Sequence, residues 1–136
     1  MRVKDYYQQI LELADLEIEA TSIADSRRIL REIEEREEIL RDIHLSIKRD
    51  IRYLEADFMK RKRELHLTYL EKKDSSVRRF IGRGNSRVKA MKKLEDEKEE
   101  TLGSYHELKS MSEELLIEME KAKKPLQDFV LNRLGL

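Results

Sequence analysis

Apolar side chains recur at helical spacing along two long stretches of the sequence, residues 25–73 and 87–134. Charged residues make up 43% of the chain and hydrophobic residues 39%, so a thick globular core is excluded while a narrow seam between extended helices is possible. The sequence therefore predicts an all-α fold, a long antiparallel helical hairpin of the coiled-coil type. The two apolar stripes consist of Ile29, Ile33, Leu40, Ile43, Ile47, Ile51, Leu54, Phe58, Leu65 and Tyr69, and of Met91, Leu94, Leu102, Tyr105, Leu108, Leu115, Met119, Ala122, Leu126 and Val130.

A shorter helix is expected before the hairpin, at about residues 2–21, packed at the end far from the hairpin tip. Its apolar positions cover roughly half of the helix circumference, which is typical of a helix that contacts more than one neighbour. Ser22, three residues before Asp25, has the spacing of an N-cap and predicts a turn. The alternative is one unbroken helix, because the apolar positions keep their phase through this region.

The chain length of 136 residues favours a single helical domain. We expect the second helix at about residues 25–73, a basic hairpin tip at 74–86 and the third helix at about 87–134. Gly82 and Gly84 tolerate positive φ and are expected to interrupt the helix there. Pro125 lacks a backbone N–H and predicts a kink near that residue.

Blocks of opposite charge predict how the two long helices face each other. If the turn lies between residues 75 and 87, the numbers of facing residues sum to about 160. The basic block 60–63 then faces the acidic block 96–100, and the acidic block 34–38 faces the basic block 121–124. The same register places Phe58 over Gly103, where a missing side chain would leave room for the ring.

No motif in the sequence indicates catalysis, so we expect a protein without enzymatic activity, catalytic residues, metal or cofactor. There is no cysteine for disulfide or thiolate chemistry. The three histidines, His44, His66 and His106, do not converge in the predicted register and lack the Glu-x-x-His spacing of metal sites in helical bundles. Gly82-Arg83-Gly84 is not followed by the Gly-Lys-Ser/Thr of a phosphate-binding loop.

Positive charge is concentrated in one segment of this neutral chain. Residues 72–93, called here the basic segment, contain nine Lys/Arg and one acidic residue, and therefore carry a net charge of +8. Such crowding of cations costs self-repulsion, which a bound polyanion relieves. Two apolar residues, Phe80 and Ile81, lie within this basic segment. The alternatives for their side chains are stacking on a nucleic-acid base, insertion into a lipid interface, or covering the end of the apolar seam. The candidate polyanion-binding residues are Lys72, Lys73, Arg78, Arg79, Arg83, Arg87, Lys89, Lys92 and Lys93.

A second surface is expected near the end of the third helix. Its apolar residues extend beyond the seam, so part of this apolar surface is expected to be exposed in a single chain. A second copy of the chain is the simplest partner that would bury it, and we therefore expect a homo-oligomer. The candidate interface consists of Leu116, Ile117, Leu131 and Leu134.

The sequence therefore predicts a non-catalytic coiled-coil interaction protein whose basic tip binds a polyanion, nucleic acid in particular. Its expected architecture resembles the basic helical arms that reach RNA in some tRNA synthetases, a resemblance of shape without a shared motif. Without a signal peptide or a run of about 18 apolar residues, the expected location is cytoplasmic and integral membrane association is not expected. The alternatives are an acidic protein partner at the tip, an adaptor role through helix–helix contacts, and peripheral attachment to anionic membranes.

Overall fold

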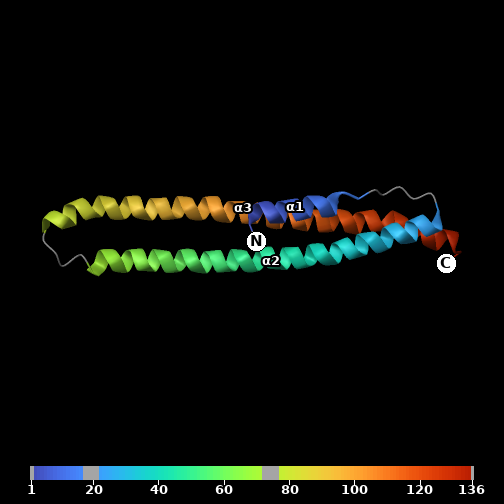
Figure 1. Ribbon diagram of the computed structural model, residues 1–136, viewed down its shortest axis with the longest axis horizontal. Coiled ribbons are helices and arrows are strands. Elements are labelled where there is room, and N and C mark those ends of the chain that lie inside the picture. The colour runs from blue at the N-terminus through green and yellow to red at the C-terminus, as the bar shows by residue number, and fades with distance from the viewer. Residues whose placement is uncertain (1, 17–21, 72–76, 136) are drawn as a thin grey trace. The chain divides into compact units, whose positions relative to one another are not determined.

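The described residues form three helices (Figure 1). The computed structural model describes residues 2–16, 22–71 and 77–135, and for residues 71 and 77–85 it describes the backbone only. Helix α1 spans Val3–Ala14, α2 spans Ile23–Glu71 and α3 spans Val77–Arg133, and none of the described residues lies in a strand. Helices α2 and α3 pack against each other, which confirms the all-α helical hairpin with a short N-terminal helix.

The chain divides into two compact units. Unit 1 contains Met1–Lys48 and Glu107–Leu136, and so combines α1 with the first part of α2 and the last part of α3. Unit 2 is Arg49–His106 and combines the last part of α2 with the first part of α3. Within each unit the segments of α2 and α3 run antiparallel.

The predicted apolar stripes form the seam in both units. Every stripe residue is buried or half-buried. Burial of these side chains stabilises the hairpin by roughly 1.5–3 kcal/mol for each fully buried Leu, Ile, Phe or Met. The most completely buried stripe residues of unit 1 are Ile29, Ile33, Leu40, Ile47, Leu108 and Met119, and the buried stripe residues of unit 2 are Ile51, Phe58, Leu94 and Leu102.

An arginine from α2 caps the C-terminal end of α1. Arg36 Nη1 donates to the backbone carbonyl oxygens of Glu12, Leu13 and Asp15 at 3.1, 3.0 and 2.7 Å. These carbonyls lie at the helix end, where they lack partners within the helix and where the helix dipole favours a cation. The helix ends at Ala14, and Asp15 and Leu16 are not helical, so the expectation that this helix continues to about residue 21 is wrong. Residues 17–21 themselves lie outside the described residues.

The junction before α2 contains the predicted cap. Ser22 Oγ accepts a hydrogen bond of 3.1 Å from the backbone N–H of Asp25, and α2 begins at Ile23. Asp15 has left the helical conformation, with ψ of 84°. Helices α1 and α2 are therefore separate, and the alternative of one unbroken helix is wrong.

The predicted interruption of the third helix at Gly82 and Gly84 is absent, whereas the kink predicted near Pro125 stays a prediction. Helix α3 begins at Val77 rather than at about residue 87 and continues through Gly82, Gly84 and Pro125. A glycine inside a helix costs only about 1 kcal/mol relative to alanine, which the helical residues on both sides offset. At Pro125 the helix is anchored on both sides by the buried side chains of Met119 and Leu126. Of the expected tip at 74–86, residues 77–86 are helical, and residues 74–76 lie outside the described residues.

The charge blocks of α2 and α3 face each other as predicted, but the predicted contact between Phe58 and Gly103 is absent. Lys123 Nζ lies 2.7 Å from Glu37 Oε1 in unit 1, and Arg61 Nη2 lies 2.7 Å from Glu97 Oε2 in unit 2. Gly103, however, is exposed, and a Cβ built on it has no atom within 4 Å. The prediction that Phe58 packs over Gly103 is therefore wrong, because Gly103 lies on the solvent side of α3 while Phe58 is buried in the seam.

Candidate polyanion interface

Three lysines of the basic segment share one exposed face of α3. Lys89, Lys92 and Lys93 are separated by three and four residues, the spacing at which helical side chains are neighbours. All three are exposed, and none forms an ion pair with another described residue. The structure therefore brings these predicted residues together as a compact cationic cluster, called here the lysine face.

Arg87 lies elsewhere and contacts α2. Its Nη2 is 2.8 Å from Nδ1 of His66, and because a guanidinium has no acceptor, it is the donor. In this arrangement His66 Nδ1 carries no proton. The predicted binding residue Arg87 is thus directed toward the facing helix and does not belong to the lysine face.

The other predicted residues are only partly placed. Lys72 and Lys73 lie outside the described residues. At five further predicted positions the structure describes the backbone but not the side chain: Arg78, Arg79, Phe80, Ile81 and Arg83. The backbone at these last five positions belongs to the first turns of α3. Arg78 precedes Lys89 by eleven residues, about three helical turns, so the two positions fall on the same side of the helix.

The start of α3 is electrostatically unfavourable for the residues that occupy it. The first turn contains no acidic residue, and Arg78 and Arg79 follow Val77 directly. The N-terminus of a helix carries a partial positive charge, so cations placed there are destabilising and anions stabilising. The lysine face continues this positive charge along the next turns of the same helix.

The basic block at residues 60–63 of α2 contributes to internal pairing, as the sequence predicts. Arg61 pairs with Glu97, and Lys62 Nζ lies 3.9 Å from Glu95 Oε1. The Arg61 guanidinium also lies over the ring of Phe58, 5.2 Å from its centre. Exposed ion pairs of this kind contribute about 0–1 kcal/mol each, so their main effect is on register.

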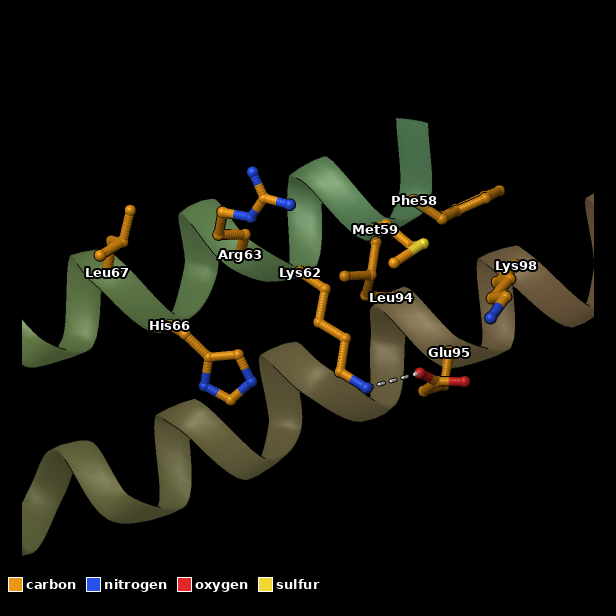
Figure 2. A pocket seen from close by; sticks show the side chains of 9 residues that line it. All are labelled: Phe58, Met59, Lys62, Arg63, His66, Leu67, Leu94, Glu95 and Lys98. Carbon is orange, nitrogen blue, oxygen red and sulfur yellow. Dashed lines mark ion pairs between the residues drawn. The ribbon is translucent and has the colours of Figure 1, made fainter. Parts of the chain in front are cut away.

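A groove in unit 2 was not predicted from the sequence. It has a volume of about 390 Å³ and lies between α2 and α3 (Figure 2). Lys62 reaches across it from α2 toward Glu95 on α3. Met59, Arg63 and Leu67 follow one another at four-residue spacing, and this second stripe on α2 is the signal that could have indicated the groove. The groove is lined by Phe58, Met59, Lys62, Arg63, His66, Leu67, Leu94, Glu95 and Lys98.

The histidines occupy separate environments. His44 Nε2 lies 3.0 Å from Glu113 Oε1, and this hydrogen bond lowers the pKa of the Glu113 carboxyl. His66 contacts Arg87, and His106 is exposed. Across the described ranges, no group of three or more His, Cys, Asp or Glu side chains is arranged to hold a metal ion.

The predicted oligomer interface remains largely uncovered in the single chain. Ile117 and Leu131 are exposed on α3, Leu134 is exposed in the turn that follows it, and Leu116 is half-buried. In the part of the chain that the structure describes, no helix is long and apolar enough to cross a membrane.

No protein-family model matches the sequence, and comparison with curated proteins and with solved structures finds no significant similarity.

Proposed function

We propose that this chain is a non-catalytic helical-hairpin protein that binds a polyanion, nucleic acid in particular, through its basic segment. The observation that carries the proposal is the lysine face, where Lys89, Lys92 and Lys93 are exposed on one side of α3 without an acidic partner among the described residues. Unpaired cations at neighbouring helical positions repel one another, and phosphate groups along a nucleic-acid strand relieve that repulsion.

The beginning of α3 supports the same proposal. Arg78 and Arg79 occupy the positive end of the helix without acidic compensation in that turn. A bound phosphate offsets both the helix dipole and the repulsion between the arginines. Arginine suits this position because its guanidinium contacts phosphate through two N–H groups. The proposal assigns the protein to the cytoplasm, where nucleic acid is accessible.

The proposal is tested by fluorescence anisotropy with labelled duplex DNA, single-stranded DNA and RNA of equal length over a series of salt concentrations. We expect binding at low salt that weakens steeply with added salt and depends little on base sequence, because phosphate contacts carry it. Absence of binding at low salt to every nucleic acid would overturn the proposal. Binding to anionic liposomes without binding to nucleic acid would assign the basic segment to a membrane surface instead.

A second proposal concerns self-association through α3. Ile117, Leu131 and Leu134 are large apolar side chains that solvent reaches in the single chain. Exposed apolar residues along the last part of α3 and just after it favour burial against a second copy. Light scattering at micromolar concentration is expected to give at least twice the 16.3 kDa chain mass, and a monomer mass would contradict this second proposal.

A further inference from the structure

The two compact units carry opposite net charges. Unit 1 has 13 basic and 18 acidic side chains, a net charge of −5, and unit 2 has 16 basic and 11 acidic side chains, a net charge of +5. Two copies of this neutral chain can therefore attract each other when unit 1 of one copy meets unit 2 of the other. Electrostatic attraction of this kind selects the orientation of partners and raises the rate at which they meet.

The groove of unit 2 offers both apolar surface and unpaired positive charge. Met59 is 64% exposed and Leu67 is 50% exposed. Arg63 and Lys98 line the same groove, and neither forms an ion pair with another described residue. Its one carboxylate, Glu95, is already paired with Lys62. The groove thus fits a partner that is apolar in the centre and acidic at the edge.

Helix α1 of unit 1 presents a surface with this chemistry. Tyr7 and Leu11 are four residues apart and are 47% and 48% exposed, while Tyr6 and Ile10, about 100° away around the helix, are buried. Glu12 and Asp15, which follow Leu11 toward the end of α1, are exposed, and the exposed Lys4 lies on the same face one turn before Tyr7. The free side of α1 is therefore an amphipathic helical face with carboxylates next to its apolar residues.

We propose that the groove of unit 2 holds the free face of α1 from a second copy of this chain. Met59 and Leu67 then contact Tyr7 and Leu11, as in other complexes where an amphipathic helix lies in a groove. Arg36 and the buried Tyr6 and Ile10 hold α1 within unit 1 of its own chain.

The charged residues at the edge of the groove also fit this contact between two copies. Arg63 and Lys98 lie opposite Glu12 and Asp15, so unpaired cations meet carboxylates. Each copy contributes both this groove and an α1, so the contact is reciprocal when two copies are related by a two-fold axis, the commonest symmetry of homo-oligomers. The inference does not depend on polyanion binding.

A nucleic acid is the competing occupant of the groove. Arg63 and Lys98 suit phosphate groups, but phosphates gain nothing from Met59 and Leu67, whose exposed aliphatic surface is covered only by another apolar surface. The observations therefore favour a helix over a phosphate backbone.

The chain has no cysteine, which makes site-directed cross-linking direct. Two single-cysteine variants, Leu11→Cys and Met59→Cys, are mixed and oxidised mildly, and the disulfide-linked dimer containing both variants is quantified by mass spectrometry. The matched control replaces Met59→Cys by Tyr53→Cys, because Tyr53 is 74% exposed on α2 of the same unit and does not line the groove. Since a docked pair of thiols has a high effective concentration, we expect the Leu11/Met59 mixture to cross-link at least about tenfold faster than the control. Equal rates would overturn the proposal.

A second experiment tests the proposed charge pairing by reversing the charges on each side of the contact. The groove variant Arg63→Glu/Lys98→Glu and the α1 variant Glu12→Lys/Asp15→Lys are each expected to lose the Leu11/Met59 cross-link, and a mixture of the two reversed variants is expected to recover it. Circular dichroism melting confirms that each variant remains folded. A cross-link that persists in the separate reversed variants would contradict the charge pairing. If the Leu11→Cys/Met59→Cys mixture cross-links no faster than the control, and the groove variant weakens nucleic-acid binding, the groove belongs to nucleic acid and the proposal is wrong.

Discussion

Lys123 Nζ on α3 lies 2.7 Å from Glu37 Oε1 on α2, and the Glu37 side chain is only 2% exposed. Arg41 Nη2 contacts the other carboxylate oxygen at 3.2 Å, and Lys123 also lies 3.0 Å from Glu120 Oε2. A buried carboxylate is costly unless a cation accompanies it. The buried seam of unit 1 therefore contains one ionic site that specifies which residues of α2 and α3 face each other.

Lys123→Met is expected to destabilise the folded protein by about 3 kcal/mol, the lower end of the range for removing one partner of a buried pair. The substitution leaves the Glu37 carboxylate buried, while the exposed Arg41 continues to compensate part of its charge. Urea denaturation followed by circular dichroism gives the free energy of unfolding.

The double variant Glu37→Leu/Lys123→Met serves as the control. Because it removes both charges, it is expected to recover most of the lost stability. Arg61→Met, which breaks an exposed pair with Glu97, is expected to cost no more than about 1 kcal/mol. Equal losses for Lys123→Met and Arg61→Met would mean that the Glu37 site is not special.

Stability is expected to fall at alkaline pH through the same site. Its close pairing with Glu37 raises the pKa of Lys123 above the ordinary value of 10.5. The folded state thus holds this proton more tightly than the unfolded state, so the contribution is complete below pH 10.5 and is lost as pH rises through the folded-state pKa. Unfolding free energies measured from pH 8 to pH 12 should decline less steeply for Lys123→Met than for wild type, and parallel curves would contradict the assignment.

Removing the arginine that terminates α1 is expected to loosen that helix. Arg36→Met deletes the donor to the carbonyls of Glu12, Leu13 and Asp15, and should cost roughly 1.5–3 kcal/mol, as for a hydrogen bond to a charged group. Hydrogen exchange is expected to accelerate in residues 3–14 and to remain unchanged in unit 2. The control Arg28→Met removes an exposed pair at 3.9 Å from Glu32, and should leave exchange in α1 unaltered.

Gly103→Ala is expected to stabilise the protein by about 1 kcal/mol, the difference in helix propensity between the two residues. The added methyl group meets no atom within 4 Å, so it causes no steric cost. Gly103→Leu is expected to raise the melting temperature as well. A lower melting temperature for both variants would show that the position is packed against a neighbour.

The sequence predicted the features that depend on repetition along the chain. The apolar stripes and the charge blocks each extend over many residues, so their spacing identified the seam and the facing blocks within which Glu37 pairs with Lys123 and Arg61 with Glu97. The features that the sequence did not predict depend on single residues and their neighbours in space. The carbonyl groups at the end of α1 accept hydrogen bonds from Arg36, which is more than twenty residues away in the sequence.

Glycine was a poor guide to the third helix for a related reason. Gly82 and Gly84 tolerate positive φ but do not require it, and helix on both sides keeps them helical. Within the candidate site, composition identified the basic segment as a whole. It did not distinguish the lysine face from Arg87, because that distinction depends on the contact with His66.

The central claim is that the basic segment binds nucleic acid through phosphate contacts. The most direct variant is Lys89→Gln/Lys92→Gln/Lys93→Gln, which removes the lysine face without removing a described ion pair. The matched control is Lys4→Gln/Lys121→Gln/Lys124→Gln, which removes three exposed lysines of unit 1 and the same amount of charge. Both variants are expected to melt near the wild-type temperature.

The deciding measurement is the slope of the logarithm of the duplex DNA association constant against the logarithm of salt concentration. Each phosphate contact contributes about 0.9 to this slope, so losing three contacts should reduce its magnitude by about 2.7. We expect that reduction in the lysine-face variant, together with weaker binding, while the unit 1 control keeps the wild-type slope. Equal slopes for wild type and the lysine-face variant, or no binding of wild type at low salt, would contradict the account.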